Sequence, residues 1–134
     1  MNETYILNVL RKIWSSESSI FWSPINPARG QCAVTALVIQ DYFGGDILKT
    51  LVSNGLWHYY NQIDRVRIDY TAEQFSEEII YLDIKSNFSE ALSETNILQY
   101  LYLSIAFDKV MNIDDYMIRK FGVTIPDEIW DNLF

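Results

Sequence analysis

The chain has 134 residues, of which 49% are hydrophobic and 21% charged, and its formal net charge is −8. This length and composition indicate one globular domain and exclude a disordered or fibrous chain. Residues 1–70 contain six acidic and six basic residues, whereas residues 71–134 contain twelve acidic and four basic ones. A surface with this charge repels phosphates, so we expect neither nucleic acid nor an anionic membrane as a partner.

The sequence contains one cysteine and one histidine. A single cysteine cannot form an intramolecular disulfide, which is typical of a reducing compartment. The sequence has no uninterrupted run of about 18 apolar residues, so we expect no membrane span. The N-terminus lacks the basic segment followed by an apolar segment that is typical of a secretion signal. We therefore expect a cytoplasmic protein. One Cys and one His are too few for a structural zinc site, and we expect no metal or other cofactor.

The first 45 residues predict two helices with a loop between them. Apolar residues recur at helical spacing over residues 3–15, and Asn2 or Thr4 can cap this helix. Residues 31–43 are apolar almost all round, which is typical of a helix buried at the centre of a domain. Gly44 and Gly45 follow and are expected to end it.

The apolar period changes to two after this helix, which predicts strands. We expect strands over residues 46–53, 56–63 and 66–70. Asn54-Gly55 is a strong signal for a two-residue type I′ turn, and Asp64-Arg65 is a second candidate turn. Together these elements predict a three-stranded antiparallel meander that follows a buried helix.

The acidic second half of the chain is less regular. Residues 71–74 have the spacing of a capping box, so a short helix is expected there, and it would carry Phe75 inward. Residues 76–94 support no assignment. We expect one α+β domain over residues 1–134, with a core in residues 1–75 and a helical, acidic part in residues 76–134.

Three more helical segments are predicted in that acidic part. Apolar residues at helical spacing mark a helix over residues 95–111, and a second, shorter group predicts another over residues 116–121. Pro126 can open a last turn, which we expect to bury Trp130 and Phe134.

Cys32 is the first candidate for chemistry, because it stands at the start of the buried helix. A helix N-terminus carries about half a positive charge, which favours a thiolate over a thiol. The backbone N–H of Cys32 could donate to an oxyanion, and the side-chain amide of Gln31 or Asn26 could support it. A lone cysteine is otherwise often a small buried hydrophobic residue.

His58 and Asp69 lie on neighbouring predicted strands. If Ile63 pairs with Val66 across the turn, His58 and Asp69 become diagonal neighbours on one face of the sheet. That is the pairing of a general base with an orienting carboxylate, and Cys32 would be the nucleophile. The arrangement requires the His58 face to turn inward, toward the helix. Otherwise His58 would be a structural histidine, and Asp69 would cap the turn that starts at Thr71.

Aromatic residues near these positions are candidates for a substrate cleft. Trp22 lies in the loop before Cys32, and Trp57, Tyr59 and Tyr60 flank His58 in sequence. A stripe of aromatic residues is more often part of a core, and the cleft is the alternative interpretation.

Several of these segments resemble a known family. Gly30-Gln31-Cys32-Ala33-Val34-Thr35-Ala36-Leu37-Val38, the segments 40–45 and 58–61, and the segment 71–75 are similar to the small bacterial YunG-like proteins. More distantly, the order of a cysteine on a helix, a histidine on a strand and an aspartate on the next strand resembles papain-like and transglutaminase-like cysteine hydrolases. That resemblance implies an α+β papain-like core, a Cys32–His58–Asp69 triad and acyl transfer on a peptide or small amide substrate.

Two functions from different classes follow from the sequence. The first is a cysteine hydrolase or acyltransferase that acts on an amide-type bond and needs no cofactor. The second is a catalytically inactive binding module of the same fold, which binds a peptide, a small ligand or a protein partner. The sequence identifies no substrate and no oligomeric state.

Overall fold

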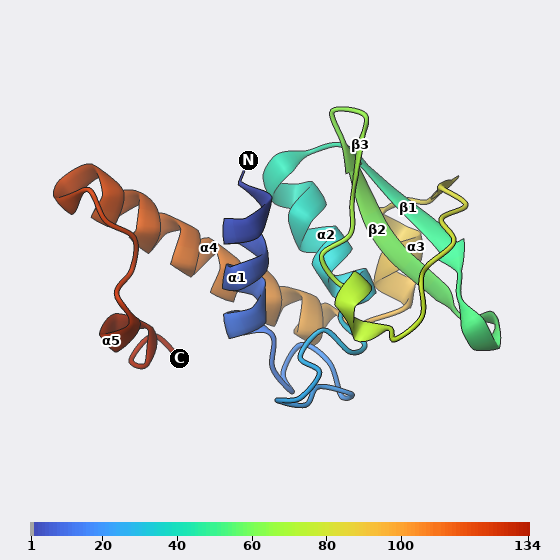
Figure 1. Cartoon of the computed structure of the whole chain (residues 1–134), viewed down its shortest axis with the longest axis horizontal. Helices are drawn as coiled ribbons and strands as arrows, with labels where there is room; N and C mark the ends of the chain where they lie inside the picture. The colour runs from blue at the N-terminus through green and yellow to red at the C-terminus, as the bar shows by residue number, and fades with distance from the viewer. Residues whose placement is uncertain (1) are drawn as a thin grey trace.

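A computed structural model describes residues 2–134 as an α+β fold with a small antiparallel sheet (Figure 1). Its elements in chain order are α1 (Glu3–Ile13), α2 (Cys32–Phe43), β1 (Asp46–Leu51), the 3₁₀ turn η1 (Ser53–Gly55), β2 (Trp57–Ile63), β3 (Val66–Ile68), the 3₁₀ turn η2 (Ala72–Gln74), β4 (Ile84–Lys85), α3 (Phe88–Ser93), α4 (Ile97–Phe121) and α5 (Asp127–Trp130). The four strands have the order β3-β2-β1-β4. The predicted meander therefore forms three neighbouring strands, and β4 extends it at the β1 edge.

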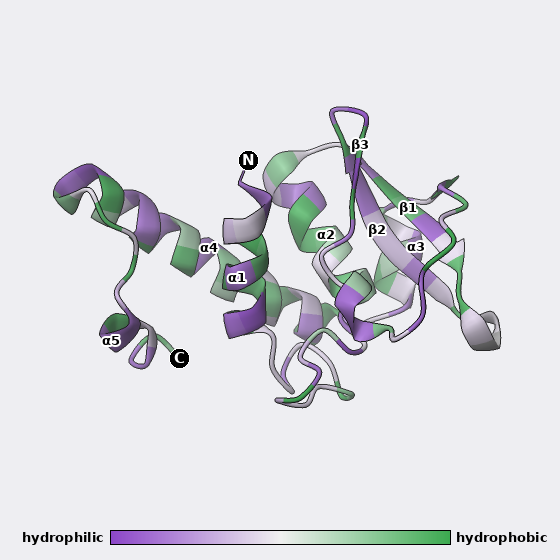
Figure 2. Cartoon of the chain, viewed as in Figure 1, coloured by the Kyte–Doolittle hydropathy of each residue, from purple (hydrophilic) through white to green (hydrophobic). Residues whose placement is uncertain are grey.

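The buried helix α2 stands between two apolar clusters. Val34, Val38 and Ile39 pack with α1 and α4 in the larger cluster. Ala36 and Leu37 pack with residues of the sheet and α3 in the smaller one. Figure 2 shows apolar colours over much of α2 and mixed colours along the outer part of α4. Because α2 buries its surface on both sides, its apolar residues are distributed all round, as the sequence predicts.

Local signals account for several boundaries. The Asn2 side chain accepts a hydrogen bond from the Tyr5 N–H at 3.0 Å and so caps α1. Gly44, with a φ of 78°, follows the last residue of α2. Asp64 and Arg65 both have positive φ, which is the backbone of the predicted two-residue turn between β2 and β3.

The prediction of a two-residue turn at Asn54-Gly55 is wrong. Residues 53–55 form the 3₁₀ turn η1, and the Val52 N–H donates to the Leu56 carbonyl, so β1 and β2 are joined by a longer loop than a two-residue turn. The short helix expected at residues 71–74 is present as η2, but its capping box is absent, because the Thr71 side chain makes no cap hydrogen bond.

The C-terminal helices also differ from the prediction. Residues 97–121 form one continuous helix instead of two, and its later part extends away from α1 and α2 (Figure 1). Its polar interruption includes Asp114, which is 3% exposed and accepts a hydrogen bond from the Ile125 N–H at 2.9 Å. The segment after α4 thus contacts the helix at Asp114, where the helical spacing of apolar residues is interrupted. Trp130 is half-buried, but Phe134 is exposed and does not join the core.

Candidate active site

Cys32 is the first residue of α2 and is partly exposed. The loop before it depends on Gly30, whose φ is 73° and where an added Cβ would lie 2.4 Å from the Ser19 Oγ. Any other residue would be strained there. The Gly30 N–H donates to the Gln74 Oε1 at 3.1 Å, which joins this loop to η2. The loop conformation therefore fixes the position of Cys32.

His58 and Asp69 form a buried hydrogen-bonded pair. The strand register is Ile63 opposite Val66, as predicted, and the His58 Nε2 lies 2.7 Å from the Asp69 Oδ2. The two side chains are 0% and 5% exposed. The Tyr81 hydroxyl donates to the same carboxylate oxygen at 2.7 Å, and the Thr71 N–H donates to the other oxygen at 3.2 Å. The carboxylate is therefore held in one orientation.

This pairing assigns different roles to the two ring nitrogens of His58. Because a carboxylate only accepts hydrogen bonds, the Nε2 carries a proton, and the Nδ1 is left as the exchangeable position. The Nδ1 is buried and has no hydrogen bond of ordinary geometry among the described residues. Burial lowers the pKa of His58, but hydrogen bonding to Asp69 and Cys32 and the charges of both outweigh it and raise the pKa to about 9.

The triad expected from the sequence requires the His58 face of β2 to turn toward α2. In the structure this face does not point toward the body of the helix. Tyr59 packs in the cluster with Ala36, and the Asn61 Nδ2 donates to the Ala36 carbonyl at 3.0 Å, so the alternate face meets the helix. β3 pairs only with residues 61–63 of β2. The edge of β2 beside His58 therefore has no strand on that side, and we infer that the first residue of α2 approaches His58 there.

The outer face is covered by the segment that follows η2. The Phe75 ring meets the His58 ring edge-on at a centroid distance of 5.0 Å. The Tyr60 ring stacks on His58 at 5.9 Å, and its hydroxyl donates to Asp83 at 2.8 Å. The Thr50 hydroxyl donates to the Ile80 carbonyl at 2.8 Å and attaches the same segment to β1. We call residues 75–83 the strap.

The predicted oxyanion support residues have structural partners. The Gln31 Nε2 donates to the Ser15 carbonyl at 3.4 Å, and the Asn26 Nδ2 donates to the Gln74 carbonyl at 3.1 Å. Their role at an oxyanion stays a prediction. No side chain caps the N-terminus of α2, so the backbone N–H of Cys32 has no capping acceptor.

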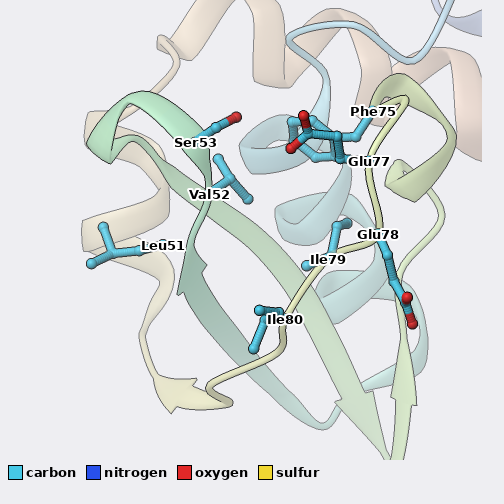
Figure 3. Close-up of a pocket in the computed structure, with 8 residues that line it drawn as sticks. All are labelled: Leu51, Val52, Ser53, Phe75, Glu77, Glu78, Ile79 and Ile80. Carbon is cyan, nitrogen blue, oxygen red and sulfur yellow. The ribbon is translucent and has the colours of Figure 1, made fainter.

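The predicted cleft aromatics are dispersed. Trp57 is partly exposed, and the Lys49 ammonium lies 4.2 Å from its ring centroid. Tyr60 is buried beside His58, and Trp22 packs at the margin of the larger core cluster. None of these three aromatics lines the hollow that Phe75 borders, whose walls come from the strap and from the end of β1 with the residues after it (Figure 3).

The comparison with known proteins assigns a family. The model of the YunG protein family matches residues 2–112, which includes Cys32, His58, Asp69 and the strap. The chain belongs to the YunG family. It is 47% identical over 108 residues to a protein of Bacillus subtilis (strain 168) named uncharacterized protein YunG, and this match covers 81% of the chain and 93% of the relative. No solved structure matches the chain.

Sequence reasoning missed three contributors to this YunG-family site. Tyr81 lies in a segment without a periodic pattern, and its hydrogen bond to Asp69 depends on how the strap crosses the sheet. The ring contact of Phe75 with His58 and the hydrogen bond from the Gly30 N–H to the Gln74 side chain also depend on this crossing. The inward position of Phe75 is the one signal that the sequence offered.

Residues 2–134 contain no group of three or more His, Cys, Asp or Glu side chains placed to hold a metal ion. Within the same range, no helix combines the length and the apolar character that crossing a membrane requires.

Proposed function

We propose that this chain is a cysteine-nucleophile enzyme that hydrolyses or transfers an acyl group at an amide-type carbonyl. The observation that supports it is the buried His58–Asp69 pair, whose second ring nitrogen is left for the only thiol of the chain. A nucleophile, a base and a group that orients the base are the components of covalent acyl transfer. In this proposal Cys32 attacks, His58 moves the proton and Asp69 holds the ring.

The charge state of His58 fits the first step. A pKa of about 9 makes the ring an imidazolium at neutral pH. A positive charge beside Cys32, together with the uncapped N-terminus of α2, stabilises a thiolate. The thiolate is the nucleophilic form of cysteine.

The proposed reaction proceeds in two halves. The Cys32 sulfur attacks the carbonyl carbon, and the electron pair of the C=O bond moves to the oxygen, near the backbone N–H of Cys32. His58 then gives its Nδ1 proton to the leaving nitrogen, the C–N bond breaks and a thioester forms. In the second half, water or an acceptor amine attacks the thioester, His58 takes its proton, and the thiolate leaves.

The kinship with papain-like and transglutaminase-like hydrolases is part of this proposal. Its support is the order of Cys32 on a helix, His58 on a strand and Asp69 directly after the next strand. The use of one histidine nitrogen for the carboxylate and the other for the sulfur is the triad logic that these enzymes require.

A binding module without catalysis is the second candidate function. The observation that favours it is the burial of His58, which is 1% exposed beneath Phe75 and Tyr60. A structural histidine would be enclosed in the same way. The two candidates differ in the reactivity of Cys32, which is partly exposed in either case.

Alkylation of Cys32 separates these candidates, because the chain has no other cysteine. We expect iodoacetamide at pH 6 to modify the folded chain at least about tenfold faster than the urea-unfolded chain, since an ordinary thiol with a pKa of about 8.5 is hardly ionised there. His58→Gln should remove this excess, whereas the control Asp83→Asn should keep it. An equal rate in folded and unfolded chains would contradict an activated thiolate.

Trapping of the acyl-enzyme tests the chemistry itself. With activated acyl esters as probes, mass spectrometry should find one acyl group on Cys32 in the wild-type chain and none in Cys32→Ser. Acylation of Cys32→Ser at the same rate would exclude Cys32 as the nucleophile.

A further inference from the structure

A hollow of about 190 Å³ is lined in part by Phe75, the residue whose ring contacts His58. Its walls come from the end of β1 and from the strap (Figure 3). The lining residues are Leu51, Val52, Ser53, Phe75, Glu77, Glu78, Ile79 and Ile80. Phe75 lines the hollow and contacts His58, so this side chain links the hollow to the proposed catalytic base.

The walls combine an apolar channel with a carboxylate. In Figure 3 the Glu77 carboxylate turns across the hollow toward Ser53, whereas the Glu78 carboxylate turns away from it. Val52 and Ile79 extend into the space below Glu77. Among the described residues neither glutamate has an ion-pair partner, so the carboxylate that faces the hollow is not neutralised by the protein.

The strap also offers backbone groups. Within residues 2–134, residues 76–79 make no backbone–backbone hydrogen bond. Their neighbours are fixed to the sheet, because the Thr50 Oγ1 accepts from the Leu82 N–H at 2.9 Å and the Asp83 N–H donates to the Tyr60 hydroxyl at 2.9 Å. An anchored segment with free N–H and C=O groups can pair with the main chain of an extended peptide.

We propose that this hollow is the specificity pocket of the proposed enzyme and takes the Lys or Arg side chain of a peptide substrate. The long methylene stem of such a side chain packs on Val52 and Ile79, and its cationic end pairs with Glu77. The peptide backbone runs along residues 76–79. The inference rests on the proposed function for its link to Cys32, but the pocket itself is tested by binding alone.

The test measures peptide binding to Cys32→Ala, in which no turnover occurs. The probes are acetyl-Ala-X-Ala-amide peptides with X as lysine, norleucine or glutamate, followed by protein NMR shifts. Norleucine keeps the stem of lysine and lacks its charge, so we expect the lysine peptide to bind about three- to fivefold more tightly, the upper range for one ion pair at an exposed site. Shifts should centre on residues 51–53 and 75–80.

Glu77→Gln in the same background should reduce the lysine preference to less than about twofold, whereas the matched control Glu78→Gln should retain most of it. Both residues are exposed, so both variants should fold. Equal binding of lysine and norleucine peptides, equal effects of the two substitutions, or no binding of any peptide would overturn the pocket. A lysine preference with an unreactive Cys32 would instead keep the pocket and reject the enzyme.

Discussion

The two faces of β2 carry different kinds of side chain, although they alternate along the same seven residues. On the face toward α2, Tyr59 packs in an apolar cluster and Asn61 bonds the Ala36 carbonyl. On the outer face, His58 belongs to a network of titratable groups with Asp69 and Tyr81. A strand period of two thus lets one segment serve the core and the candidate site at once.

The two faces of β2 have different effects on the candidate site. The helix-facing residues fix α2 relative to β2, and so they set where Cys32 lies. The outer residues set the charge of the ring that meets Cys32. Substitutions on the first face should therefore change stability, and those on the second should change how stability and reactivity depend on pH.

The largest effect is expected on the helix-facing side. Tyr59 is 1% exposed, so Tyr59→Ala should lower the free energy of unfolding by about 3–5 kcal/mol through lost burial and the cavity left behind. Urea denaturation measures this change. Tyr116→Ala, at a site that is 51% exposed, is the control and should cost less than about 0.5 kcal/mol. A cost below about 1 kcal/mol at Tyr59 would remove this face from the core.

The next effect is on the outer face and depends on pH. The pKa of His58 is raised to about 9 in the folded chain, above its ordinary value of 6.5, so the folded state binds this proton more tightly. The stabilisation is complete below pH 6.5 and is lost as pH rises through 9, by up to about 3 kcal/mol. Urea midpoints at pH 6 and pH 9.5 measure the loss. His58→Gln should lack this component, and an unchanged pH dependence in that variant would contradict the assignment.

A smaller effect is expected for Asn61. Asn61→Ala removes the hydrogen bond that this buried side chain donates to the Ala36 carbonyl and leaves a small cavity, so it should cost about 1–2 kcal/mol. The pH component assigned to His58 should persist in this variant. Gln62→Ala, on the partly exposed adjacent residue, is the control. If Asn61→Ala abolished the pH component, the two faces would not be separable.

The smallest effect concerns Tyr81. Tyr81→Phe removes the hydroxyl that donates to the Asp69 Oδ2 at 2.7 Å, with an expected cost of about 0.5–1.5 kcal/mol. His58 keeps its own bond to Asp69, so Cys32 alkylation should change less than about threefold. A larger loss of reactivity would show that the strap sets the orientation of the carboxylate.

The register of β2 and β3 could be predicted because the turn at Asp64-Arg65 is local. Once Ile63 faces Val66, the alternation of side chains places His58 and Asp69 together without further information. The central position of α2 was also predictable, since a helix that is apolar all round has few other places in a small domain.

The rest depends on contacts between distant residues. Which face of β2 meets α2 is decided by the fit of Tyr59 and Asn61 against Ala36, and no pattern within β2 alone records this. The strap has no period because single side chains, such as Thr50 with the Ile80 carbonyl, hold it to the sheet. Gln31 and Asn26 illustrate the same limit, because an amide next to a thiol in sequence can have its partner elsewhere.

The central claim is that His58 is an imidazolium held between Asp69 and the Cys32 sulfur. Because His58 is the only histidine, its ring can be titrated without ambiguity by NMR. The account predicts a pKa near 9 in the wild-type chain, with the Nε2 protonated throughout, and a lower pKa in Cys32→Ala and in Asp69→Asn. A ring that titrates at or below 6.5, with the same pKa in Cys32→Ala, would contradict it.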